Sequence, residues 1–170
     1  MGHYNNATIC LNGHVVSKYQ ANYQKFCSKC GKETYSKCPE CNSPIHGKYE
    51  VDGIVDLSGS YNRPDYCYNC GAPYPWTKII LDNAVMLVSL EDELDESMKE
   101  LIKTAIPDLI TETPATPIAI AKYKKGIKCA GDILKNSMRQ LFAYSARTAH
   151  PFQRNGAPFR FKLSKAQQVD

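Results

Sequence analysis

Residues 26–41, with the sequence FCSKCGKETYSKCPEC, place four cysteines in one short stretch as two CxxC pairs. A third pair, Cys67 and Cys70, follows in YCYNCG. Thiols at this spacing can bind a metal ion, form a redox centre or form disulfides. The 170-residue chain has eight cysteines in all, so the chemistry of these pairs decides the fold class.

The surroundings of the pairs favour metal binding. A redox CxxC pair normally begins a helix that follows a buried strand, whereas these pairs lie between turns. The start of the chain, MGHYNNATIC, lacks the basic and apolar regions of a secretory signal, and no run of about 18 apolar residues indicates a membrane helix. We therefore expect a cytoplasmic protein with no membrane contact, and disulfides do not persist in that compartment.

Each CxxC pair is a candidate zinc knuckle, a tight turn that supplies two metal ligands. A fourth candidate knuckle lies in CLNGHVV, where Cys10 precedes His14 by four residues and Gly13 helps to form the turn. Four knuckles supply seven thiolates and one imidazole, which make two complete tetrahedral ligand sets of the kind that structural zinc prefers. We therefore predict two structural Zn²⁺ ions per chain. The predicted ligands are Cys10, His14, Cys27, Cys30, Cys38, Cys41, Cys67 and Cys70.

The spacing leaves three ways to pair the knuckles. Sequential pairing joins the first knuckle to the second and the third to the fourth; nested and crossed pairings are the alternatives. We favour sequential pairing because HVVS and YQKF can form a hairpin within the first ribbon, and IHGKYEVDGIVDL can supply the strands of the second. If His14 is not a ligand, the first set has three thiolates and an open position.

The pattern along the chain predicts an α+β protein: two small zinc-ribbon β modules with rubredoxin-like knuckles, followed by an α-helical domain. Residues 1–76 hold seven of the eight cysteines and many turn signals, so we expect a double zinc-ribbon domain there. Residues 77–146 are expected to be helical, and residues 147–170 to form a basic, aromatic tail. Trp76 is expected to pack between ribbon and helix.

Within the helical part, polar residues mark the expected helix ends. Thr77, Ser89 and Thr116 are predicted N-caps, and Pro107 is predicted to end the second helix. A long apolar stripe then runs to Leu141.

Two further features lie along this stripe. Gly126 and Gly131 interrupt it and argue against one unbroken helix. Cys129 has no ligand partner at a suitable spacing, so we expect it to be a small buried hydrophobic residue.

The charges divide along the chain. Residues 91–112 carry eight acids and two lysines, a sum of −6, while residues 122–165 carry eleven basic residues and one acid, a sum of +10. The basic half could face a nucleic acid. The simpler interpretation is that the two stretches form neighbouring helices that attract each other.

The stretches CLNGHVV, FCSKCG, CPECNSPIHG and YCYNCGAPYPWT resemble an uncharacterised bacterial zinc-ribbon family, classed as a domain of unknown function. The elements CxNGH and CGxPYPW carry most of the resemblance, because generic zinc ribbons lack the PYPW tail. The resemblance implies zinc binding at the eight predicted ligand positions and implies no established activity.

These observations favour a non-catalytic binding or adaptor protein with an unidentified protein partner or self-association. Many tyrosines of the first half suit a protein interface. The main alternative is a nucleic-acid-binding regulatory protein that uses the basic C-terminal half, and the second is an enzyme with an open zinc site. The sequence contains none of the common nucleotide-binding or hydrolase motifs.

Overall fold

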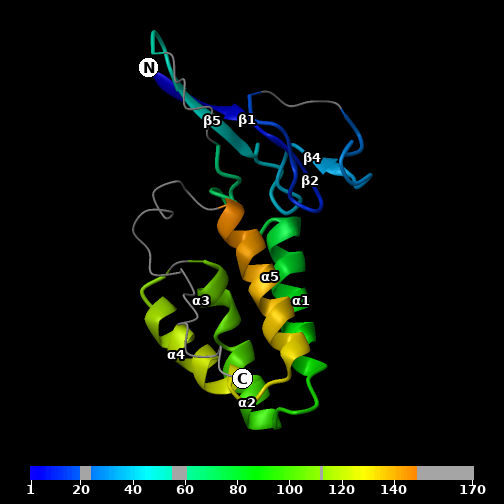
Figure 1. The fold of residues 1–170 in the computed structure, drawn as a ribbon. Helices are drawn as coiled ribbons and strands as arrows, with labels where there is room; N and C mark the ends of the chain where they lie inside the picture. The colour runs from blue at the N-terminus through cyan, green and yellow to red at the C-terminus, as the bar shows by residue number, and fades with distance from the viewer. Residues whose placement is uncertain (20–23, 55–60, 112, 149–170) are drawn as a thin grey trace, which may run out of the picture.

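A computed structural model describes residues 1–19, 24–54, 61–111 and 113–148, with side chains up to residue 141. The fold is α+β, as the sequence predicts: short antiparallel strands form one end of the molecule and helices form the other (Figure 1). The strands are β1 (Gly2–Asn6), β2 (Thr8–Cys10), β3 (Val15–Ser17), β4 (Thr34–Tyr35) and β5 (His46–Val51). The helices are α1 (Pro75–Ser89), α2 (Glu96–Lys103), α3 (Ile106–Ile110), α4 (Thr116–Ile127) and α5 (Asp132–Thr148). Residues 149–170, most of the predicted tail, lie outside the described residues.

The strands form two small sheets, with pairings that differ from the expected hairpins. Strand β3 pairs with β2 rather than with the segment around Phe26, and β2 also pairs with β4. Strand β5 pairs with the N-terminal strand β1, in the register His3 opposite Glu50. The expected strand pairings within each ribbon were therefore wrong, because β1 and β2, at the start of the chain, supply strands to both sheets.

A small apolar cluster lies beneath the knuckles. It contains Ile9 and Ile45 from the strand region and Tyr74 and Trp76 from the start of α1. Trp76 is only 1% exposed, and its indole N–H donates a hydrogen bond to the carbonyl of Pro64 at 3.0 Å. Trp76 therefore fixes the first turn of α1 against the cysteine-rich half.

The helices enclose a second and larger apolar cluster. Its fully buried members include Val88 from α1, Ile102 from α2 and Met138 from α5. Helices α1 and α5 run side by side away from the sheets, α2 lies at their far end, and α3 and α4 lie along one side of the pair (Figure 1). No helix of the described ranges has the length and apolar composition that crossing a membrane requires.

The predicted helix caps are not the ones that the structure uses. Helix α1 begins at Pro75, so Thr77 lies inside it, where its hydroxyl donates to the carbonyl of Asp65 at 2.8 Å. Ser89 ends α1 instead of starting the next helix, and Asp95 caps α2 by accepting a hydrogen bond from the Met98 N–H. These threonine and serine hydroxyls bond to backbone carbonyls instead of capping.

Two other helix-end predictions also fail. Helix α4 begins at Thr116 itself, and its hydroxyl donates to the carbonyl of Asp108. Helix α2 ends at Lys103, and Pro107 lies in the first turn of α3, where a proline costs no hydrogen bond.

The apolar stripe of the C-terminal helices is divided between two helices, as Gly126 and Gly131 predicted. Helix α4 ends at Ile127 and α5 begins at Asp132. Cys129 lies in the connection between them and is exposed, so the expectation that it is buried was wrong. The turn removes this residue from the apolar face that an unbroken helix would have given it.

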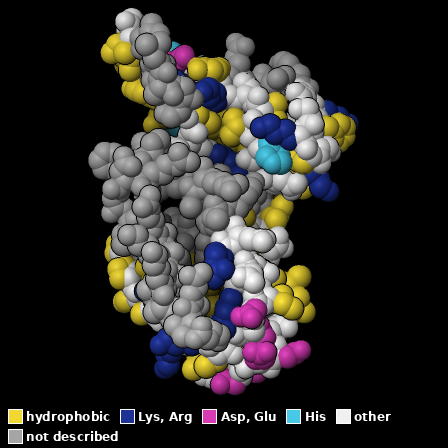
Figure 2. All heavy atoms as spheres, in the orientation of Figure 1, with side chains coloured by type: hydrophobic (Ala, Val, Ile, Leu, Met, Phe, Trp, Pro, Cys, Tyr) yellow, Lys and Arg dark blue, Asp and Glu magenta, His cyan; other side chains and the backbone are white. Residues whose placement is uncertain are grey.

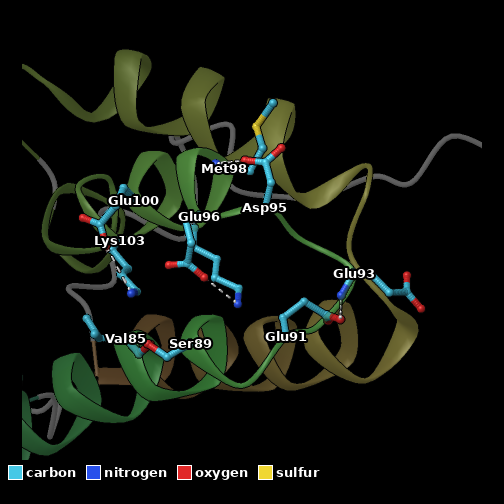
Figure 3. A network of polar contacts seen from close by, with 10 residues as sticks. Val85, Ser89, Glu91, Glu93, Asp95, Glu96, Met98, Glu100 and Lys103 are labelled. Carbon is cyan, nitrogen blue, oxygen red and sulfur yellow. Dashed lines mark hydrogen bonds and ion pairs between the residues drawn. The ribbon is translucent and has the colours of Figure 1, made fainter.

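The acidic segment neutralises its own lysines and not those of α4. Lys99 pairs with Glu96 at 3.0 Å, and Lys103 pairs with Glu100 at 3.2 Å, both within α2 (Figure 3). Helix α2 packs against α4. Even so, among the described residues no ion pair joins the acids of 91–111 to the lysines of α4. The two helices are neighbours, but their apolar faces hold them together.

Gly126 generates a test of this packing. A Cβ atom at Gly126 would lie 2.6 Å from the Cγ1 and Cδ1 atoms of the fully buried Ile102. Helix propensity alone favours Gly126→Ala by about 1 kcal/mol, but overpacking costs about 1–3 kcal/mol. We expect Gly126→Ala to lower the free energy of unfolding, measured by urea denaturation. In an Ile102→Ala background the same change should become neutral or stabilising, and destabilisation in both backgrounds would contradict this packing.

Candidate metal centres

The eight predicted ligands lie in two groups of four, and the grouping is sequential. Cys10, His14, Cys27 and Cys30 form the first group, and Cys38, Cys41, Cys67 and Cys70 form the second. In each group one donor atom per residue lies within 4.8 Å of the other three. All eight cysteines of the chain are free thiols.

The donor separations match those of a tetrahedral metal site. Metal–sulfur bonds of about 2.3 Å imply sulfur–sulfur edges of about 3.8 Å. In the first group the Sγ atoms of Cys10 and Cys30 are 3.7 Å apart, and His14 Nδ1 lies 3.3 Å from Cys30 Sγ. In the second group the Sγ atoms of Cys38 and Cys70 are 3.8 Å apart, and those of Cys41 and Cys67 are 3.6 Å apart. The residues present therefore fit a soft, four-coordinate cation such as zinc.

The three CxxC knuckles share one backbone geometry. In each, the N–H of the first cysteine donates to the carbonyl five residues later, as from Cys27 to Lys32 at 2.7 Å and from Cys67 to Ala72 at 2.8 Å. The N–H groups two and three residues after the first cysteine donate to its Sγ. These amides stabilise the thiolate form, which is the form that binds metal.

The residue after each CxxC pair adopts a positive φ. Gly31 and Gly71 have φ values of +67° and +72°, and Asn42 has a φ of 60° at the same position of the knuckle formed by Cys38 and Cys41. Asparagine tolerates this region better than other non-glycine residues. Sequence reasoning missed Asn42, although its position directly after the second cysteine could have identified it.

The surroundings raise the pKa of some of these thiols and lower the pKa of others. Burial raises the pKa of Cys10 to about 11. The hydroxyl of Ser43, 3.3 Å from the Sγ of Cys41, together with the Ser43 backbone N–H, lowers the pKa of Cys41 to about 6. Thiols this close cannot all ionise without a cation, because adjacent negative charges repel each other.

Tyr74 supports the second group from below. Its side chain is 1% exposed, and its hydroxyl is hydrogen-bonded to Cys67. Burial and this thiol together raise the pKa of the Tyr74 hydroxyl. A neutral phenol therefore donates to a ligand sulfur. The PYPW element that carries the family resemblance thus supplies both a contact to the ligand group and the buried Trp76.

A buried arginine joins the two groups, and sequence reasoning missed it. The guanidinium of Arg63 donates to the carbonyl of Gly13 at 3.0 Å, lies 5.6 Å from the ring centre of Trp76 and pairs with Asp65 at 3.5 Å. Gly13 precedes the ligand His14, while Asp65 precedes the Cys67 knuckle. A side chain at Gly13 would overlap the guanidinium. No sequence pattern marks such an arginine as buried.

A groove of about 460 Å³ lies between the first ligand group and the start of the helical half. His14 is one of the residues that line it. The remaining lining is apolar or made of neutral amides and a hydroxyl, from Leu11, Asn12, Trp76, Ile79, Ile80, Asn83, Ser137, Gln140 and Leu141.

The fold and these groups define an α+β protein with two cysteine-rich sets of candidate metal ligands in its N-terminal half. The chain belongs to the family described as "Uncharacterized protein conserved in bacteria (DUF2321)", whose model matches residues 3–148. This finding confirms the predicted resemblance to an uncharacterised bacterial family. No curated protein and no solved structure matches the chain.

The shared knuckle geometry predicts how substitutions after each CxxC pair behave. A Cβ atom at Gly31 or Gly71 would meet no other atom within 4 Å, so only backbone strain penalises alanine there. We expect Asn42→Ala, Gly31→Ala and Gly71→Ala each to reduce the free energy of unfolding by about 1–2 kcal/mol. Asn42→Gly should cause little change. Thermal denaturation followed by circular dichroism would measure these effects, and an Asn42→Ala protein as stable as the native chain would contradict the geometry.

Proposed function

We propose that the chain is a non-catalytic binding protein in which two structural zinc ions hold the N-terminal half as a rigid surface for a partner. The observation that carries this proposal is the convergence of two complete four-donor sets, each within 4.8 Å. Zinc is favoured because one set has three sulfurs and one imidazole nitrogen, a combination typical of structural zinc sites.

The size of the N-terminal core supports a structural role for the metals. The apolar cluster beneath the knuckles has few members, and several of them are ligand cysteines. A core of this size supplies little stability by itself, and bound metal compensates for a missing core in small domains. Binding free energy then becomes folding free energy, because the ligand sets do not exist in the unfolded chain.

The ligand count argues against catalysis at the metals. A catalytic zinc keeps one position open for water or substrate, whereas four protein donors fill the tetrahedron. Hydrolytic zinc sites also place a carboxylate near the bound water. Among the described residues that line the groove beside His14, none is a carboxylate. These features disfavour the alternative of an enzyme with an open zinc site.

The exposed rings of the N-terminal half support a binding role. His46 lies between Tyr4 and Tyr68, with ring centres 4.2 and 3.8 Å away and planes nearly parallel. Tyr4 and Tyr68 are both more than half exposed. Tyr68 lies between two ligand cysteines, so the metal site would fix this stack in place. Rigid aromatic side chains at a surface bind partners at low cost in conformational entropy.

Native mass spectrometry of the purified protein, before and after chelation, tests this proposal. We expect two zinc ions per chain. Cys67→Ser should release one metal and unfold the N-terminal half, while the exposed Cys129→Ser should keep both metals and serves as the matched control. Iron in place of zinc, fewer than two ions, or equal metal loss from both variants would contradict the assignment.

A further inference from the structure

The second knuckle carries an exposed ring that its fold does not use. Phe26 immediately precedes Cys27, and 54% of it is exposed. Its backbone is fixed on both sides: Phe26 forms a bridge with Glu33, and the Phe26 carbonyl accepts a hydrogen bond from Gln24 at 2.7 Å. The ring is therefore held at the surface by the knuckle and not by packing of its own.

Lysines are frequent in this knuckle. Lys25, Lys29 and Lys32 are all exposed, and the ammonium group of Lys25 lies 5.6 Å from the Phe26 ring centre. Among the described residues none of these three lysines has an ion-pair partner. The one acid of the knuckle, Glu33, accepts a hydrogen bond from the Tyr35 hydroxyl. The surface made of Phe26, Lys25, Lys29 and Lys32, here called the basic knuckle, thus carries three lysines against the single acid Glu33, with one flat ring exposed beside Lys25.

The densest group of acidic side chains lies away from the basic knuckle. It belongs to residues 91–100, and magenta atoms gather at the far end of the helical half in Figure 2. A polyanion would therefore be repelled at the α2 end, and the basic knuckle lies in the cysteine-rich half at the other end of the molecule (Figure 1).

We propose that the basic knuckle binds single-stranded nucleic acid, with Phe26 stacking on an unpaired base and the three lysines contacting phosphates. This inference rests on the proposed binding function and names its partner class. A flat ring within a cationic surface is the combination that binds single strands without sequence preference. A base in a duplex has no free face for such stacking.

Two other anionic partners fit this surface less well. Insertion into a membrane surface needs several apolar side chains. Within residues 24–37, Phe26 is the only large apolar side chain that is exposed. An acidic protein segment could pair with the lysines, but ion pairing alone gives the exposed ring no role.

The lysines of α4 provide an internal comparison. Lys124 and Lys125 of α4, and Lys128 directly after it, are exposed and lack ion-pair partners among the described residues, yet no exposed aromatic ring of the described chain lies on α4. If charge alone decides binding, α4 and the basic knuckle should contribute alike. If stacking contributes, only the knuckle should matter for single strands.

Fluorescence anisotropy of a labelled oligo(dT) of about 15 nucleotides, titrated with the full chain, tests the proposal. We expect single strands to bind more tightly than a duplex of equal length. Stacking of one base contributes about 1–3 kcal/mol, so Phe26→Ala should weaken binding by about 5- to 150-fold. Phe26→Tyr should retain binding. Met86→Ala, which removes an equally exposed side chain from α1, is the control and should change nothing.

Salt dependence tests the phosphate contacts. Each lysine that contacts a phosphate contributes about −0.7 to the slope of log K against log salt for a single strand. Lys29→Ala and Lys32→Ala should each flatten the slope by this amount, and Lys124→Ala should leave it unchanged. Loss of affinity from the α4 variant instead of the knuckle variants would overturn the proposal.

Metal content, measured by native mass spectrometry on every sample, separates the two proposals. Loss of affinity in a Phe26→Ala protein that retains two metal ions supports the stacking role. No binding of the metal-containing native chain to oligo(dT), or binding that Phe26→Ala leaves intact, overturns this inference while the structural-zinc proposal stands. Binding to an acidic peptide or to anionic vesicles without binding to oligo(dT) also overturns it. A metal-free chain that still binds through Phe26 would overturn only the zinc proposal.

Discussion

The N-terminal half depends on one constraint: it must bring together two groups of four donor atoms, and the atoms of each group lie within 4.8 Å of one another. Each group joins two knuckles that are separated in sequence, and the residues between them have few apolar side chains. The positive φ values after the CxxC pairs, the amide groups that point at sulfur and the short strands all follow from bringing these donors together. Thiolates at such distances repel each other, and a cation at the centre of each group would remove this repulsion.

The two groups are mechanically linked to the helices through a few buried polar contacts. Arg63 ties the turn before His14 to the segment before the last knuckle, and it stacks on Trp76 in the first turn of α1. The side chain of Thr77 bonds to the same segment. A buried guanidinium is costly unless its hydrogen bonds are made. Its conformation therefore requires the first ligand group, the last knuckle and α1 to be in place together.

We could predict the ligand sets, the α+β class and the break between α4 and α5 from the sequence, because local spacing encodes each of them. CxxC pairs followed by glycine specify a turn, and two glycines in an apolar stripe weaken a helix. The strand pairings could not be obtained in this way: β1 joins β5 across more than forty residues, and nothing in either segment names its partner. The helix caps failed for a related reason, since Thr77 and Thr116 have carbonyl partners that become neighbours only in the folded chain. The burial of Arg63 could not be predicted from the sequence, because burial of a charged side chain depends on its tertiary partners.

The charge distribution of the chain takes a different meaning once the fold is known. As a linear pattern, the acidic and basic stretches suggested two helices that attract each other, yet α2 pairs its lysines with its own glutamates and meets α4 through apolar contacts. Lys25, which lies beside an exposed ring, belongs to the second knuckle, and the small net charge of the whole N-terminal half does not reveal it. A turn held by metal ligands would display such side chains at little cost, because the ligands and not the displayed residues would maintain its conformation. Under the two proposals made above, the knuckles would combine two roles that a larger apolar core would separate: the scaffold of the N-terminal half and its surface for a partner.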